Sequence, residues 1–254
     1  MTTAPLLPAL IAAAREAGAA AMRHYEAGTA VETKADGSPV TAADRAAEAV
    51  ILAALAELAP SIPAISEEEA AAGRIPDRDQ RFWLVDPLDG TKEFVRRSGE
   101  FTVNIGLIDH GAPVLGIVYA PVIDDLYAAA EGRAWRSLGG EPLRPIAART
   151  PPAAGLTVLT SRSHGKGAAV EDYLAALPVA ERVSRGSSLK ICLIAAGEAD
   201  LYPRFGPTCE WDTAAADAVL RAAGGMIERL DDGAPLPYGK PDYLNPNFVA
   251  RGRR

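Results

Sequence analysis

Runs of apolar residues divide the chain into helices and strands whose order differs between its two halves. An alanine-rich amphipathic pattern predicts a helix over 5–25, and a second apolar stripe predicts a helix over 41–58. Thr41 and Asp44 at the start of the second helix resemble a capping box. Strands are predicted at 63–65, 82–85, 101–108, 114–119 and 126–130, with a short helix after residue 91. We therefore expect an α+β first half whose later strands form an antiparallel meander.

The second half has a different order of elements. Helices are predicted over 168–177, 188–196 and 213–223, and strands over 156–160, near 182–183 and over 199–202. Strands that alternate with helices favour an α/β lobe. Paired prolines at Pro151 and Pro152 can join neither a helix interior nor a central strand. We place the boundary there, with lobes at residues 1–148 and 149–254 and an α/β fold class overall.

Composition and charge exclude several classes of protein. With 254 residues, 48% hydrophobic and 23% charged, the chain can bury a substantial core. A net charge of −7 argues against a sequence-independent nucleic-acid binder. Cys192 and Cys209 fit neither a disulfide framework nor a zinc pattern, so a reducing cytoplasm is expected. No apolar stretch approaches a transmembrane span, and the N-terminal pattern indicates a helix and not a signal peptide.

Acidic residues gather at strand ends and in the first turns of helices. Five share this kind of position: Asp44, Glu67, Asp86, Asp89 and Asp212. Each has a structural explanation by itself, since Asp44, Asp89 and Asp212 suit helix caps and Glu67 stands in a run of solvated acids. Together they are harder to explain, because carboxylates packed closely repel one another unless a cation lies among them. The set therefore predicts a divalent-metal site.

The ligand types indicate which metal. Oxygen ligands without His or Cys select Mg²⁺, Mn²⁺ or Ca²⁺ over zinc, and the Asp86 and Asp89 carboxylates, with the Leu88 carbonyl between them, can bridge two such ions. Gly90 and Thr91 then begin a predicted helix whose N–H groups suit an anion. Two cations beside a phosphate seat are typical of a hydrolysis in which one ion activates water and both stabilise charge.

These motifs resemble the inositol monophosphatase superfamily. The similarity rests on Trp83 to Phe94, on Glu67 and Glu68 upstream, and on Trp211 to Ala216 downstream, although the family usually carries glycine near Ala216 and Asp217. The resemblance implies a layered α/β/α/β/α sandwich of sugar-phosphatase type. It also implies metal ligation by Glu67, Asp86, Leu88, Asp89 and Asp212, two or three Mg²⁺ ions with Mn²⁺ as an alternative, and Asp44, Thr91 and Glu67 as catalytic groups.

Within the superfamily, residues 90–95 and 99–105 are similar to the 3'(2'),5'-bisphosphate nucleotidases of the CysQ type. By this resemblance the substrate is adenosine 3',5'-bisphosphate, hydrolysed to AMP and phosphate in sulfur metabolism, with lithium as an inhibitor. A net-acidic protein needs dedicated cations for the phosphate that is not cleaved, and Lys190 and Arg204 are the candidates. The implied substrate contacts are Asp89, Gly90, Thr91, His164, Ser187, Lys190, Arg204 and Asp212.

Several alternatives stay open. His164 is equally explained as a turn residue, Lys190 as a solvated helix position, and Tyr202 and Phe205 as core residues. The same scaffold supports inositol monophosphatase or fructose-1,6-bisphosphatase activity, and a non-catalytic nucleotide sensor is a more distant alternative. We expect a monomer or homodimer with a small phosphorylated nucleotide as partner. We expect the protein to be cytoplasmic. A peripheral position at the inner membrane is implied by the family resemblance alone.

Overall fold

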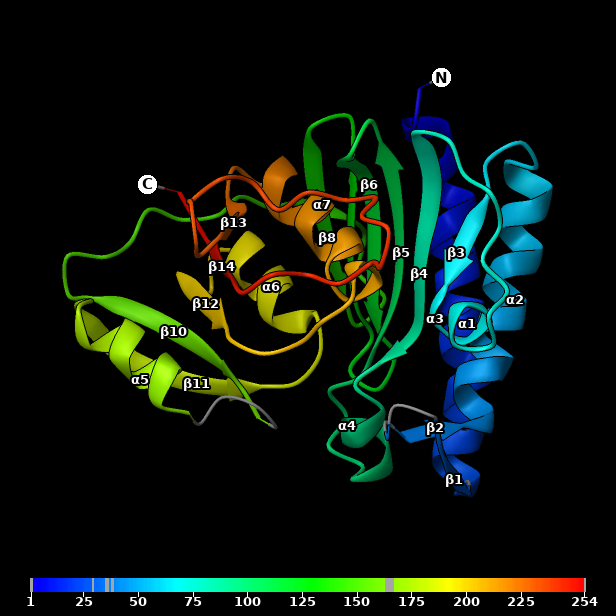
Figure 1. Ribbon diagram of the computed structural model, residues 1–254, viewed down its shortest axis with the longest axis horizontal. Helices are drawn as coiled ribbons and strands as arrows, with labels where there is room; N and C mark the ends of the chain where they lie inside the picture. Colours follow the sequence, from blue (N-terminus) through cyan, green and yellow to red (C-terminus); the bar gives the residue numbers. More distant parts are fainter. Residues whose placement is uncertain (1, 29, 35–36, 38, 163–166, 254) are drawn as a thin grey trace.

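The computed structural model describes residues 2–28, 30–34, 37, 39–162 and 167–253, and it stacks helices and sheets in five layers (Figure 1). Helices α1 (Leu7–Ala27) and α2 (Ala42–Leu58) cover one face of a seven-stranded sheet, and α6 (Leu189–Ala195) and α7 (Ala214–Ala222) lie between that sheet and a five-stranded one. Helix α5 (Ala168–Ala175) covers the outer face of the smaller sheet. The expected α/β/α/β/α sandwich is confirmed.

Most elements begin and end close to the positions that the hydrophobic pattern predicts, but the strands Val31–Thr33 and Pro39–Thr41 and the short helix Glu67–Ala71 were not predicted. The helices are α1 Leu7–Ala27, α2 Ala42–Leu58, α3 Glu67–Ala71, α4 Thr91–Val95, α5 Ala168–Ala175, α6 Leu189–Ala195 and α7 Ala214–Ala222, with 3-10 turns η1 Ala4–Leu6 and η2 Glu210–Asp212. The strands are β1 Val31–Thr33, β2 Pro39–Thr41, β3 Ala64–Ser66, β4 Arg81–Asp89, β5 Thr102–Asp109, β6 Ala112–Ala120, β7 Asp125–Ala130, β8 Arg133–Leu138, β9 Arg144–Pro145, β10 Leu156–Ser161, β11 Val179–Arg185, β12 Leu201–Arg204, β13 Met226–Arg229 and β14 Phe248–Arg251. Among the described helices, none combines the length and apolarity needed to cross a bilayer.

The larger sheet runs in the order β3-β4-β5-β6-β7-β8-β9. Strand β3 pairs in parallel with β4, and every later pair is antiparallel, as the predicted meander requires. Strands β8 and β9 were not predicted, because two polar residues, Arg136 and Ser137, follow Trp135 in β8 and both residues of β9 are exposed. Short strands of this kind carry too weak an apolar alternation to be read from sequence.

Helices α1 and α2 bury their small apolar faces on this sheet. Ala14 and Ala17 of α1 and Ile51 and Leu55 of α2 are buried together with Trp83 of β4 in one core cluster. The capping box at the start of α2 is confirmed, because the Thr41 hydroxyl accepts from the Ala43 N–H while Asp44 Oδ2 accepts from the Thr41 N–H. This cap fixes the first turn of α2, on which the site depends.

The opposite face of the larger sheet receives α7. Its approach is close because Gly106 and Gly116 stand under the helix, and a Cβ placed on Gly116 would lie 2.1 Å from the Ala215 carbonyl oxygen. The turn η2, which carries Asp212, directly precedes α7 in the chain. An acid from the second half is therefore placed against the sheet of the first half.

The smaller sheet has the order β11-β10-β12-β14-β13 and mixes parallel with antiparallel pairs. Both strands after α7, β13 and β14, escaped the sequence analysis. The sheets change between β9 and β10, yet one core cluster joins Leu84 and Val118 of the first half to Ile191 and Val219 of the second. The division at residues 148 and 149 stays a prediction.

Candidate active site and metal centre

Asp86 and Asp89, which were expected to follow the strand predicted at residues 82–85, lie within the last residues of strand β4. Strand β4 continues past Val85, and its register against β5 shifts between the pairs Asp86 with Asn104 and Asp89 with Thr102. The shift admits one extra residue on β4, and Pro87 is tolerated there because a bulge needs no ladder N–H at that point. The bulge places both aspartates on the β4 end that faces the site.

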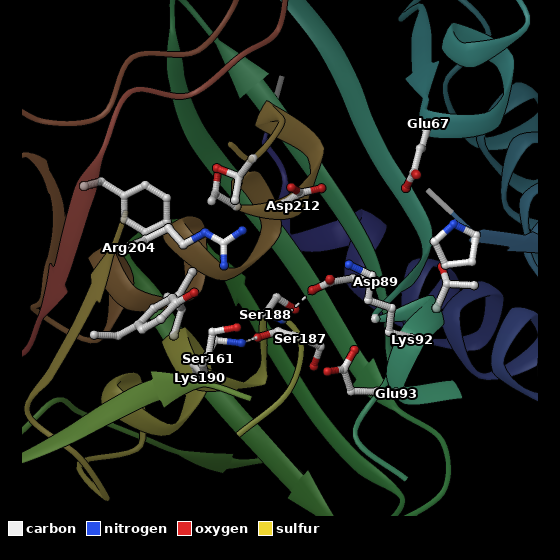
Figure 2. Close-up of a pocket in the computed structure, with 18 residues that line it drawn as sticks. Glu67, Asp89, Lys92, Glu93, Ser161, Ser187, Ser188, Lys190, Arg204 and Asp212 are labelled. Atoms are coloured by element: carbon white, nitrogen blue, oxygen red, sulfur yellow. Dashed lines mark hydrogen bonds between the residues drawn. The ribbon is translucent and has the colours of Figure 1, made fainter. Parts of the chain in front are cut away.

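Three carboxylates from distant parts of the chain converge. Glu67 begins α3, Asp86 lies in the β4 bulge and Asp212 ends η2; one oxygen atom from each lies within 4.8 Å of the others. Figure 2 shows Glu67 and Asp212 approaching a common space from opposite sides, with Asp89 below them. Asp212 is held by the Cys209 N–H, which donates to its Oδ2 at 2.9 Å. The predicted convergence of these acids is therefore found.

The electrostatics of this cluster fit a divalent cation. Burial, reinforced by repulsion from Glu67 and neighbouring aspartates, raises the pKa of Asp86 well above its usual range. Burial and repulsion from Asp89 and Glu67 raise the pKa of Asp212 in the same way. Burial also raises the pKa of Asp89 to about 6, against the opposing effect of Lys190. Each acid is costly to ionise beside the others, and a bound divalent cation would offset that cost. Carboxylate oxygens are ligands that suit Mg²⁺ or Mn²⁺.

A lysine that sequence analysis did not single out contacts the cluster. Lys34 follows β1, and its Nζ donates to Glu67 Oε1 and Glu68 Oε1, each at 2.6 Å. Burial by itself would lower the pKa of Lys34. The two carboxylates have the larger combined effect, so the pKa of Lys34 is raised. Glu68 remains affected by its own burial, which raises its pKa to about 7. One ammonium group thus partly neutralises the acids at this edge of the site.

Asp44 and Thr91 form a second feature of the site. Asp44 is buried, and its Oδ2 accepts hydrogen bonds at 2.8 Å from both the N–H and the hydroxyl of Thr41. Its other oxygen, Oδ1, accepts from the Thr91 hydroxyl at 3.3 Å. Since the Thr91 hydroxyl donates its hydrogen bond to Asp44, the lone pairs of Thr91 Oγ1 are left free to accept a hydrogen bond from a further donor, such as a water molecule.

Thr91 and the acids Glu67, Asp89 and Asp212 line a pocket of about 220 Å³ between the two halves of the chain. Its other wall comes from β12 and the start of α6 (Figure 2). The lining residues from both walls are Pro39, Glu67, Asp89, Gly90, Thr91, Lys92, Glu93, Ser161, Ser187, Ser188, Lys190, Ile191, Tyr202, Arg204, Thr208, Asp212, Thr213 and Phe248. Carboxylates therefore stand opposite buried cations across one small space.

The two cations of this wall are Lys190 and Arg204, which are 4% and 8% exposed. Lys190 Nζ donates to the Ser187 carbonyl at 2.5 Å and lies over the ring of Tyr202. Burial lowers the pKa of Lys190 to about 8, although Asp89 acts in the other direction. Arg204 donates from Nη2 to the Pro207 carbonyl, while its buried Nε has no hydrogen-bond partner among the described residues. Both cations retain donor capacity toward the pocket.

A hydrogen bond ties the two walls together. The backbone N–H of Ser188 donates to Asp89 Oδ2, joining the α6 end to the β4 end. The Ser188 hydroxyl also bonds Asn104 at 2.7 Å and Thr102 at 2.9 Å on β5. Asp89 is therefore oriented by the second half of the chain and not by a cap of α4, whose N-cap residue is Gly90 in the left-handed region.

Comparison with known proteins identifies the family. A model of the inositol monophosphatase family matches residues 3–253. The chain belongs to this family. The 3'(2'),5'-bisphosphate nucleotidases CysQ of Shigella flexneri and Escherichia coli K12 are 52% and 51% identical to it, over 92% of this chain and 95% of theirs.

Solved structures agree with that family assignment. CysQ from Bacteroides thetaiotaomicron is 39% identical, covers 97% of this chain and 96% of its own, and superposes with a TM-score of 0.82. An inositol monophosphatase from Anabaena is 27% identical, covers 98% of this chain and 91% of its own, and gives a TM-score of 0.77. Inositol monophosphatase family members are metal-dependent, which accords with the acidic cluster described above.

The departure from the family pattern at Ala216 and Asp217 affects how helix α7 packs against its neighbours. Asp217 is buried on α7, where Arg221 donates to it at 3.0 Å and the Tyr238 hydroxyl at 3.1 Å. These contacts join α7 to the segment after β13 and involve none of the clustered acids. The substitution therefore leaves Asp212 in place.

The structure locates most of the predicted site residues but not all of them. His164 lies outside the described residues. Leu88 is buried and its N–H donates to Asp86 Oδ1 at 3.0 Å, so ligation by its carbonyl stays a prediction. Ser188 and Lys34 contact the site, although the sequence analysis did not predict them as site residues. Ser188 stood beside Ser187 in a segment already singled out, whereas Lys34 reaches Glu67 across a fold contact that leaves no local signal.

Proposed function

We propose that this protein is a metal-dependent 3'(2'),5'-bisphosphate nucleotidase that hydrolyses adenosine 3',5'-bisphosphate to AMP and phosphate. The observation that carries the proposal is the acidic cluster of Glu67, Asp86 and Asp212, of which Glu67 and Asp212 line one pocket together with buried Lys190 and Arg204. A substrate with two phosphates needs one site for cleavage and one for retention. The curated CysQ relatives, at 50% identity and above, bear the name of this activity.

The acidic wall is assigned to the metals. Glu67, Asp86, the Leu88 carbonyl, Asp89 and Asp212 would hold two or three Mg²⁺ ions, with Mn²⁺ as a substitute. Bound there, such ions would supply activation of water and stabilisation of negative charge on the phosphoryl and leaving oxygens. The carboxylates themselves must be deprotonated to ligate, and their raised pKa values mean that ions and protons compete for them.

Asp44 and Thr91 are assigned to the attacking water. The Thr41 bonds fix Asp44, and Asp44 fixes the direction of the Thr91 hydroxyl. With its own proton directed at Asp44 Oδ1, Thr91 Oγ1 accepts a hydrogen bond from water and turns an oxygen lone pair of that water toward the phosphorus. This orientation requires no proton on Asp44, because the carboxylate acts only as an acceptor.

The opposite wall is assigned to the nucleotide. Lys190, Arg204 and Ser187 would bind the phosphate that is retained, with His164 as a further contact. Arg204 offers a planar fork and Lys190 a point charge. Gly90 and Thr91, at the start of α4, would seat the phosphate that is cleaved. By this activity the protein would remove a by-product of sulfate activation in the cytoplasm.

A phosphate-release assay tests the proposal. The substrates are adenosine 3',5'-bisphosphate, its sulfated relative, inositol 1-phosphate and fructose 1,6-bisphosphate, each with and without Mg²⁺. AMP, which lacks the 3'-phosphate, is the matched control. We expect the highest kcat/KM for adenosine 3',5'-bisphosphate and no release without the metal. A higher kcat/KM for inositol 1-phosphate would assign the site to the other branch of the family.

A further inference from the structure

A buried carboxylate outside the acidic cluster contacts the segment that carries Glu67. Glu48, on α2, is 6% exposed. Its Oε1 accepts three hydrogen bonds, from the Ser66 hydroxyl at 2.5 Å, from the Glu68 N–H at 3.1 Å and from the Glu69 N–H at 3.3 Å. These donors stand on both sides of Glu67, so Glu48 holds the side chain of the residue before it and the backbone after it.

The segment lacks the means to hold itself in place. Helix α3 spans only five residues, and the side chain of its N-cap residue, Ser66, makes no capping hydrogen bond within α3. A single helical turn is not stable alone, and its first N–H groups need acceptors. Glu48 supplies the acceptor from another helix. Without it, two N–H groups and a buried hydroxyl would lose their partner, and the start of α3 would be free to shift.

Helix α2 thereby aligns two parts of the site. Asp44 and Glu48 are four residues apart and share one face of the helix. Asp44 accepts from the Thr91 hydroxyl, and Glu48 accepts from the N–H of Glu68, the residue that follows Glu67. Since α2 is capped and packed on the larger sheet, the spacing between these two points is set by one helical turn.

We propose that Glu48 is a positioning residue for the divalent metal: it holds Glu67 at the distance from Asp86 and Asp212 that ligation needs. This rests on the metal-dependent function proposed above. All three hydrogen bonds end on one oxygen of Glu48, so the role requires an acceptor and not a charge. A glutamine side chain keeps that oxygen, whereas alanine removes it.

Mn²⁺ binding, measured without substrate from the electron paramagnetic resonance signal of the free ion, tests this role. We expect Glu48→Ala to weaken Mn²⁺ binding about tenfold or more, in the range typical of groups that orient metal ligands. Glu48→Gln should restore it to within about threefold of the unsubstituted protein. In steady-state assays, the Mg²⁺ needed for half-maximal activity should rise for Glu48→Ala, with a smaller change in KM for the nucleotide at saturating Mg²⁺.

A matched variant separates positioning from loss of stability. Asp200 is also a buried carboxylate, and it accepts from Arg149 and from the Thr157 N–H; neither it nor these partners line the pocket. Asp200→Ala should lower the melting temperature and leave Mn²⁺ affinity unchanged. Unchanged Mn²⁺ affinity in Glu48→Ala, or equal losses in the Ala and Gln variants, would overturn the proposal.

A milder variant decides the matter if Glu48→Ala does not fold. Ser66→Ala removes one of the three donors, and we expect it to weaken Mn²⁺ binding about twofold to fivefold. Unchanged Mn²⁺ affinity there would overturn the proposal. Because no substrate is present, the result does not depend on which phosphate ester the enzyme hydrolyses, and a failure of the nucleotidase assignment would be seen only in the substrate panel.

Discussion

Lys34 Nζ lies 2.6 Å from Glu67 Oε1, so an ammonium group contacts the carboxylate that a divalent ion is proposed to bind. The Lys34 side chain is 10% exposed and the Glu67 side chain 27% exposed. A cation is therefore already present at one edge of the acidic cluster, and metal loading must displace it or share Glu67 with it.

Lys34→Met should tighten metal binding, because it removes a competitor for Glu67. A partly exposed ion pair contributes about 1 kcal/mol, which corresponds to about fivefold in affinity. Calorimetric titration with Mg²⁺ measures the change. Arg74→Met, which removes an exposed cation that pairs with half-buried Glu69, is the matched control and should leave the affinity unaltered. Weaker Mg²⁺ binding in Lys34→Met would show that the lysine supports the metal site.

Asp89→Asn should abolish hydrolysis while the protein stays folded. The amide oxygen can still accept the Ser188 N–H, but the negative charge for the metal is lost. We expect kcat to fall about a thousandfold, as for the removal of a principal electrostatic group. Phosphate release and far-UV circular dichroism give the two readouts, and Asp79→Asn at an exposed position is the control. Full activity in Asp89→Asn would remove this acid from catalysis.

Lys190→Ala and Arg204→Ala should each raise KM for adenosine 3',5'-bisphosphate more than for adenosine 3'-monophosphate. A hydrogen bond to a charged group contributes about 1.5 to 3 kcal/mol, which corresponds to about tenfold or more in KM. Steady-state kinetics on both nucleotides provide the comparison. Equal rises for the two substrates would exclude these residues from recognition of the second phosphate.

The value of kcat/KM for adenosine 3',5'-bisphosphate should fall as the pH rises through about 8. Burial lowers the pKa of Lys190 to about 8, so its ammonium group is present below that pH and lost above it. Lys190→Arg keeps its charge at higher pH and should abolish the alkaline fall. A flat profile for the unsubstituted enzyme between pH 7 and 9.5 would contradict this role.

Gly116→Ala should destabilise the fold, because the added Cβ would lie 2.1 Å from the Ala215 carbonyl oxygen and force α7 away from β6. Overpacking of this kind costs about 1 to 3 kcal/mol in the free energy of unfolding. Urea denaturation measures it. Gly167→Ala, whose Cβ would meet no atom of the described residues within 4 Å, is the control and should change stability by about 0.5 kcal/mol or less. Equal stability of both variants would show that α7 can shift at little cost.

Local signals accounted for most of the helices and for the central strands. The amphipathic stripes of α1 and α2, the cap formed by Thr41 and Asp44, and the apolar runs of β4 to β7 follow from side-chain periodicity and backbone capping, which act over a few residues. Strands β1, β2, β8, β9, β13 and β14 were not foreseen. Their place is set by pairing with neighbours already formed, and not by a strong pattern of their own.

The sequence by itself determined the chemistry of this protein: an acid set without His or Cys ligands, and the motifs that carry its family resemblance. Tertiary structure alone decided which acids share a centre. Glu67, Asp86 and Asp212 meet because α3, the β4 bulge and η2 end at one place, while Glu48, Lys34 and Ser188 act through contacts between distant segments. Such contacts depend on how layers pack, and packing brings together residues whose separation along the chain leaves no periodic trace.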